Sequence, residues 1–220
     1  MLRDAWLVAR KDLRIELRSR VLTTQVLPFA LACLLLFALA LGPSTSFLHQ
    51  AAPGVLWVVV LFATVLAAQR SAAVEADDGA RDRLLASGLD PAGLLLGKAL
   101  AVALQLLVLE AVLTVGTVVL FDAAPATWWT LLLAELLAAV GLAVVSVIFA
   151  TLAEGARARD SLLPLLSLPT VAPILVAGTK VYASALEGSG TPGSWLGLLA
   201  VFAVAYLAIG VLLSGALQET

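Results

Sequence analysis

Three ionisable side chains lie in or beside long apolar runs of this 220-residue sequence, and groups of these types can bind protons or cations. Glu110 and Glu135 lie inside such runs, and Lys180 lies near the end of another. Charge is costly in an apolar medium, so such residues face a bundle interior or pair together. At 1.5 Å per residue, Glu110 lies about 15 Å and Glu135 about 10 Å from the facing ends of their runs. We expect a shared level, where the carboxyls line a polar route or only hold helices together, with Lys180 as a candidate cation partner.

Little other chemistry is available. His49 is the only histidine and Cys33 the only cysteine, and Met1 is the only methionine. Haem iron takes such ligands, so His49 is a candidate haem contact, although an ordinary surface histidine is the favoured interpretation. Since the sequence has no cluster of metal ligands and no serine with a histidine partner at membrane depth, we expect no metal site and no enzymatic activity.

A glycine pair with a lysine, Gly93, Gly97 and Lys98, resembles a phosphate-binding loop only superficially. One residue is missing between the glycines, and Ala99 replaces the required Ser or Thr. The spacing instead favours close helix contact at small residues. Any ATP used by this protein must therefore be bound by a partner.

The elements that carry these residues are predicted to be membrane helices. The chain is 62% hydrophobic and 13% charged, with a mean hydropathy of +1.06, and this composition excludes an ordinary soluble domain. The predicted fold class is an all-α integral membrane protein with six transmembrane helices in residues 21–220. These spans cover about 21–41, 51–68, 94–121, 128–152, 162–181 and 195–217.

Basic residues set the predicted orientation. Twelve of the thirteen Lys and Arg residues lie on one side of this topology, and only Lys180 lies on the other. By the positive-inside rule, both termini are cytoplasmic. Residues 1–20 are predicted to form an amphipathic interfacial helix, with Trp6 and leucines on one face and basic residues for anionic lipid on another. A cleavable signal is the weaker interpretation, because the apolar run is too long.

The fifth span contains Pro164, Pro169 and Pro173. Proline interrupts the helical hydrogen-bond ladder, so this span is predicted to be kinked or broken. Such a break either lines a pathway or is static.

The longest hydrophilic connection is the segment 70–93, on the cytoplasmic side. Glu75 to Ala86 is predicted to form a short helix, and Gly88 and Pro91 end it before the third span. Mixed charge beside an exposed Leu84–Leu85 pair favours a docking element over a solvated loop. The candidate docking residues are Glu75, Asp78, Gly79, Arg81, Leu84 and Leu85.

Several motifs point to a known family. The leader followed by Glu75, Gly79, Leu84–Leu85, Pro91 and Lys98 between the second and third spans resembles the membrane subunits of ABC-2-type transporters. More narrowly, the chain resembles the cytochrome c maturation protein B family, also called haem exporter B. That resemblance is carried by Asp12-Leu13-Arg14, Leu41-Gly42-Pro43, Ala52-Pro53-Gly54-Val55-Leu56-Trp57-Val58, and Pro169 with Pro173-Ile174-Leu175.

The resemblance implies ABC-2-type permease architecture in a bacterial inner membrane, serving haem export or handling in c-type cytochrome maturation. The segment 70–93 would dock on a cytoplasmic ATPase of the cytochrome c maturation protein A type. The membrane partner would be a second copy or a protein of the C type, and a haem chaperone would complete the system. Haem would be handled by the complex, and no nucleic acid is implied.

Two alternatives stay open at this stage. The first is an ABC-2-type exporter subunit for another cargo. The second is a proton-coupled secondary transporter that uses Glu110 and Glu135 and needs no ATPase.

Overall fold

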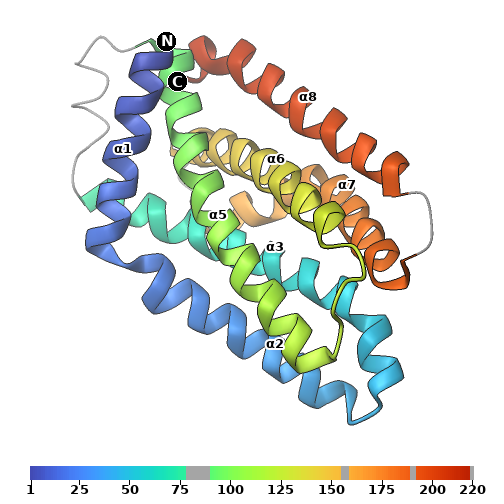
Figure 1. Ribbon diagram of the computed structural model, residues 1–220. Helices are drawn as coiled ribbons and strands as arrows, with labels where there is room; N and C mark the ends of the chain where they lie inside the picture. Colours follow the sequence, from blue (N-terminus) through green and yellow to red (C-terminus); the bar gives the residue numbers. More distant parts are fainter. Residues whose placement is uncertain (78–89, 155–158, 189–191, 219–220) are drawn as a thin grey trace.

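The computed structural model describes residues 1–77, 90–154, 159–188 and 192–218, and these are almost entirely helical (Figure 1). No strand occurs within these ranges. The helical elements in chain order are α1 (Leu2–Ser19), the π-helical turn η1 (Leu22–Val26), α2 (Leu27–Leu41), α3 (Thr45–Asp77), α5 (Pro91–Phe121), α6 (Trp128–Glu154), α7 (Arg159–Glu187) and α8 (Pro192–Gln218).

Five helical segments are long and apolar enough to cross a bilayer. They are Leu22–Leu41, Thr45–Gln69, Pro91–Phe121, Trp128–Leu152 and Pro192–Gly215. They coincide with five of the six predicted spans, so the chain is an all-α integral membrane protein. The remaining predicted span is the fifth, 162–181. It lies within α7, whose described part is less apolar because it carries Pro169, Pro173 and Lys180.

Helix α1 is present where the amphipathic helix was predicted, and a face of small residues packs it against the bundle. The buried residues are Ala5, Val8 and Ala9, which pack on α5, whereas Trp6 is 60% exposed. The predicted apolar residues Leu2 and Leu17 are exposed as well. Small side chains allow close helix approach, so the smaller residues face the bundle and the larger ones face outward.

The chain turns sharply after α1. Arg20 has a left-handed backbone conformation with φ of 55°, and its carbonyl oxygen accepts hydrogen bonds from the Thr23 and Thr24 hydroxyls at 3.1 and 2.7 Å. The Glu16 side chain accepts a hydrogen bond from the Leu22 backbone N–H at 2.6 Å. These bonds satisfy backbone groups that the bend leaves without helical partners. The bend lets α1 lie along the first half of α5 while α2 continues away from it (Figure 1).

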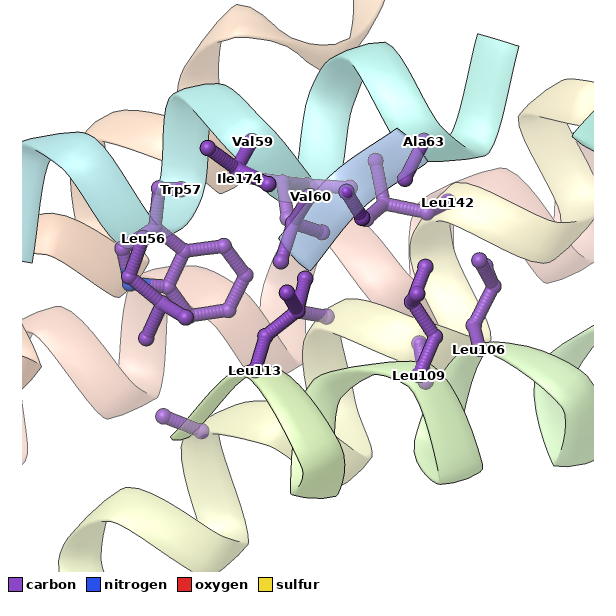
Figure 2. Close-up of a cluster of buried hydrophobic side chains, with 14 of the residues drawn as sticks. Leu56, Trp57, Val59, Val60, Ala63, Leu106, Leu109, Leu113, Leu142 and Ile174 are labelled. Carbon is purple, nitrogen blue, oxygen red and sulfur yellow. The ribbon is translucent and has the colours of Figure 1, made fainter. Parts of the chain in front are cut away.

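The core lies where α3 and α5 face each other, with α6 and α7 closing it. Figure 2 shows α3 residues Leu56, Val60 and Ala63 opposite Leu109 and Leu113 of α5. These side chains are at most 1% exposed. Since lipid tails are as apolar as these side chains, the gain is close packing rather than removal from water.

The fifth span was predicted to be kinked or broken. Helix α7 runs without interruption through all three prolines, so it is not broken. Proline removes one backbone donor at each position, but neighbouring helices can satisfy the carbonyls near it. The Tyr206 hydroxyl of α8 donates to the Thr170 carbonyl, between Pro169 and Pro173, at 2.5 Å. That bond ties α8 to the proline-rich half of α7.

Candidate functional site

Two buried carboxyls lie on α5 and α6, helices that pack against each other. Glu110 is 1% exposed and Glu135 is 4% exposed. Glu135 is close enough to Glu110 to act on it electrostatically, as predicted from their depths. The Thr114 hydroxyl, one turn beyond Glu110 on α5, donates to Glu135 Oε1 at 2.5 Å. We call Glu110, Thr114 and Glu135 the carboxyl pair site.

The two carboxyls differ in their hydrogen bonding. Glu135 has the Thr114 hydroxyl, whereas neither oxygen of Glu110 has a hydrogen-bond partner among the described residues. A buried polar group without a partner is uncommon and costly, and it marks a site where a proton, water or ion has to be considered. Glu110 is therefore the unusual member of the pair.

Lys180 does not supply the cation. Its side chain is exposed on α7, and within the described ranges no ion pair joins it to either carboxyl. Tyr182, two residues further, is buried near Glu135, but its hydroxyl donates to the Ala123 carbonyl at 2.9 Å. The backbone N–H of Ala126 also donates to the Ala185 carbonyl of α7 at 2.8 Å. These bonds hold the α5–α6 connection against α7. The residues of the carboxyl pair site itself all belong to α5 and α6.

A second polar site lies at the other end of α5 and was missed by sequence reasoning. It is a pocket of about 90 Å³ between α1, α3, α5 and α6. Its polar lining consists of Asp12, Glu16, Ser19, Thr64, Lys98, Gln105, Ser146 and Thr151. Only Lys98 and Gln105, which interrupt the apolar pattern of α5, signal it in the sequence. Small-molecule sites have volumes of about 300–1,000 Å³, so this pocket is too small for a large cargo.

The Gly93–Gly97 pair forms the close helix contact that its spacing predicted, and its partner is α1. An ideal Cβ on Gly97 would lie 2.5 Å from the Ala5 carbonyl oxygen and 2.7 Å from the Val8 Cβ. At Gly93 it would lie 3.0 Å from the Met1 carbonyl oxygen. We call this contact the α1–α5 clamp.

The start of α5 is fixed just before the clamp. Asp90 is the N-cap residue, and its Oδ2 accepts a hydrogen bond from the Gly93 backbone N–H at 3.0 Å. Pro91 follows in the first helical turn, where its missing N–H leaves no bond unmade. The beginning of α5 is thus a defined junction between the preceding connection and the clamp.

Most candidate docking residues lie outside the described residues. Glu75 belongs to the last turns of α3, which ends at Asp77. Asp78, Gly79, Arg81, Leu84 and Leu85 fall in 78–89. Their docking role stays a prediction. Of the prolines, Pro169 is exposed, Pro173 is half-buried, and Pro164 contributes to the continuous helix α7.

His49 is the one candidate haem contact that the sequence predicted, and its role is not tested by the structure. His49 is half-buried in the first turns of α3, and Cys33 is half-buried in α2 and packs against the core. Within the described ranges, no group of three or more His, Cys, Asp or Glu side chains could hold a metal ion.

Comparison with known proteins gives whole-chain matches. The chain matches the protein-family model described as CcmB protein over residues 3–218. It is 28% identical over 198 residues to heme exporter protein B of Haemophilus influenzae, covering 88% of this chain and 86% of the relative. It is 33% identical over 181 residues to heme exporter protein B of Rhodobacter capsulatus, covering 81% and 82%. It is 32% identical over 200 residues to heme exporter protein B of Paracoccus denitrificans, covering 90% and 91%.

Proposed function

This chain belongs to the CcmB protein family, and on that premise we propose that it is the membrane-spanning subunit of an ABC-type complex that exports or handles haem for c-type cytochrome maturation. The match over residues 3–218 carries this proposal. The subunit itself is not catalytic, and ATP is hydrolysed by a cytoplasmic ATPase of the cytochrome c maturation protein A type. The relatives are named heme exporter protein B, and this name supports haem export as the process that the chain serves.

The α1–α5 clamp supports a mechanical role for the connection 70–93. This connection leads directly into the capped start of α5, and the clamp joins that start to α1. A displacement imposed by a docked ATPase would therefore move α1 and the beginning of α5 together. Close packing transmits such displacements because the two helices leave no space between them that could absorb the movement. Glu75, Asp78, Gly79, Arg81, Leu84 and Leu85 are the proposed docking residues.

The proposed setting is a bacterial inner membrane with both termini in the cytoplasm. The two ends of the described chain lie at the same end of the bundle (Figure 1). The basic residues of α1 lie with that end, whereas Lys180 lies in the half of α7 that binds the α5–α6 connection. This arrangement agrees with the positive-inside rule if α7 crosses the membrane in addition to the other five helices. The interfacial orientation of α1, with Trp6 toward lipid, belongs to the same proposal.

The proposed membrane partner is a second copy of this chain or a protein of the cytochrome c maturation protein C type, with a haem chaperone receiving the cargo. The pocket beneath α1 is about 90 Å³, and His49 is the only histidine. A haem route shared between two membrane proteins would supply both the space and the ligands. This chain would then contribute helices and conformational change rather than a haem-binding cage.

Complementation tests the proposed function. The gene is expressed in a bacterium whose own heme exporter protein B gene has been deleted, and covalent haem in c-type cytochromes is measured by haem staining after denaturing electrophoresis. We expect cytochromes to be restored, as they are by the host gene and not by an empty vector. Unrestored cytochromes, with the chain present in the membrane and its partner ATPase co-expressed, would favour an ABC-2-type exporter of another cargo.

A further inference from the structure

We propose that Glu110 and Glu135 form a proton-binding site between α5 and α6, in which Glu110 holds the proton and Glu135 is the neighbouring carboxyl that accepts a hydrogen bond from Thr114. The proposal concerns the carboxyl pair site alone. It does not depend on the identity of the cargo, on an ATPase, or on haem. The ligand is a proton, and no metal or organic molecule is needed to complete the site.

The state of Glu110 follows from its surroundings. It is 1% exposed, and both carboxyl oxygens are buried without a hydrogen-bond partner among the described residues. An ionised carboxylate in such a place is stabilised neither by water nor by a donor, and that penalty exceeds the cost of binding a proton at neutral pH. A protonated carboxyl has no net charge, so it is compatible with this burial. Glu110 therefore carries a proton.

The state of Glu135 is set by a different environment. The Thr114 hydroxyl donates to its Oε1, which gives this carboxyl the donor that Glu110 lacks. Two ionised carboxyls at interaction distance repel strongly in a medium of low dielectric constant. One proton on Glu110 removes the repulsion, and Glu135 keeps the Thr114 hydroxyl as its donor. The different partners thus assign different roles to two residues of the same type.

No other charge competes for this proton in the surrounding elements. In their described residues, η1, α2 and α8 carry no Asp, Glu, Lys, Arg or His. Helix α3 carries His49 in its first turns and Arg70, Glu75 and Asp77 in its last turns, on either side of the core residues. The charges of α1 and Lys98 lie toward the other end of α5, with Lys98 about 18 Å from Glu110 along the helix. On α7, Lys180 and Glu187 are exposed, and the Tyr182 hydroxyl is bonded to Ala123. Glu135 is the one ionisable neighbour that acts on Glu110.

Infrared difference spectroscopy tests the proposal directly, because a protonated carboxyl has a carbonyl stretching band that a carboxylate lacks. The full-length chain is reconstituted in lipid nanodiscs at neutral pH, where solvent-exposed carboxyls are ionised. We expect a protonated-carboxyl band in the wild type, loss of that band in Glu110→Gln, and an unchanged band in Glu187→Gln. Glu187 is exposed, so this variant is the matched control.

Isotope labelling keeps the test decisive where Glu110→Gln does not fold. In wild-type protein with carbon-13 in the glutamate carboxyls, the band must shift to lower frequency, since it arises from glutamate. A wild type without such a band at neutral pH, or a band that survives Glu110→Gln, contradicts the proposal. So does loss of the band when sodium or potassium replaces an organic cation at constant ionic strength, because the occupant would then be a metal cation.

Discussion

A Cβ on Gly97 of α5 would lie 2.5 Å from the carbonyl oxygen of Ala5 in α1, closer than the two atoms can approach. Glycine at this position therefore sets the separation of the two helices. The contact sits just after the Asp90 cap, at the point where the proposed docking connection enters the bundle. The proposed mechanism depends on this contact, because it makes α1 move with α5.

Gly97→Ala is expected to destabilise the protein by about 1–3 kcal/mol, since a methyl group would have to push two backbones apart. Gly54→Ala is the matched control within helix α3, where a Cβ meets nothing within 4 Å. Because alanine is the better helix former, the control is expected to be neutral or stabilising by about 0.5–1 kcal/mol. Unfolding in mixed micelles by titration with a denaturing detergent measures both. Equal stabilities would show that the clamp is not tight.

Gly178→Ala is expected to destabilise the contact between α3 and α7. Its Cβ would lie 2.5 Å from Cζ2 of Trp57, so the indole ring would have to move within the core. In a Trp57→Leu background the obstructing ring is gone, and the cost of Gly178→Ala should shrink by about 0.5–3 kcal/mol. A double-mutant cycle of unfolding free energies measures this coupling, and additive effects would contradict the contact.

Thr114→Val is expected to cost about 1–3 kcal/mol, because it removes the hydroxyl that donates to buried Glu135 while keeping the side-chain shape. Thr117→Val is the matched control on the same helix. The Thr117 hydroxyl is also buried, but it donates to the Leu113 carbonyl of its own helix. The control should therefore cost less than Thr114→Val in the same unfolding measurement. The reverse order would show that the Thr114 bond contributes little.

Anionic lipid is expected to stabilise the protein through α1. Arg10, Arg14 and Arg18 are exposed on α1, close to the exposed apolar side chains Leu7 and Leu17. Basic side chains near an anionic surface contribute about 1 kcal/mol each. Wild-type unfolding should require more denaturant in anionic than in zwitterionic nanodiscs, and replacing the three arginines by Gln should remove most of the difference. Lys180→Gln, outside α1, should retain most of it.

The sequence predicted the parts of the fold that depend on long, simple patterns. Apolar runs identified five bilayer-crossing helices because each run alone is long enough to span. The depth of Glu110 and Glu135 could be counted along their helices, so their proximity was also predictable. The Gly93–Gly97 spacing indicated a close helix contact for the same reason, because it depends on one helix only.

Features that depend on which helix packs against which were not predictable. The spacing of Gly93 and Gly97 does not reveal that α1 is their partner, and the pattern of α1 did not indicate that Ala5 and Val8 would pack on α5. The depth of Lys180 made it a candidate cation partner for the two carboxyls, but its side chain lies on the exposed side of α7. The prolines predicted a broken helix, whereas α7 is continuous, with Tyr206 of α8 bonded to the Thr170 carbonyl.

The central claim is that this subunit is driven by a partner ATPase through the connection 70–93, and affinity co-purification in mild detergent tests it most directly. The wild type is compared with Glu75→Lys plus Leu84→Asp, and with Glu187→Lys plus Phe47→Asp as a matched pair of exposed substitutions outside the connection. Partners are identified by mass spectrometry. The account predicts that an ABC-type ATPase is recovered with the wild type and the matched pair but not with the first variant. No ATPase with a folded wild type, or equal recovery with all three, would contradict it.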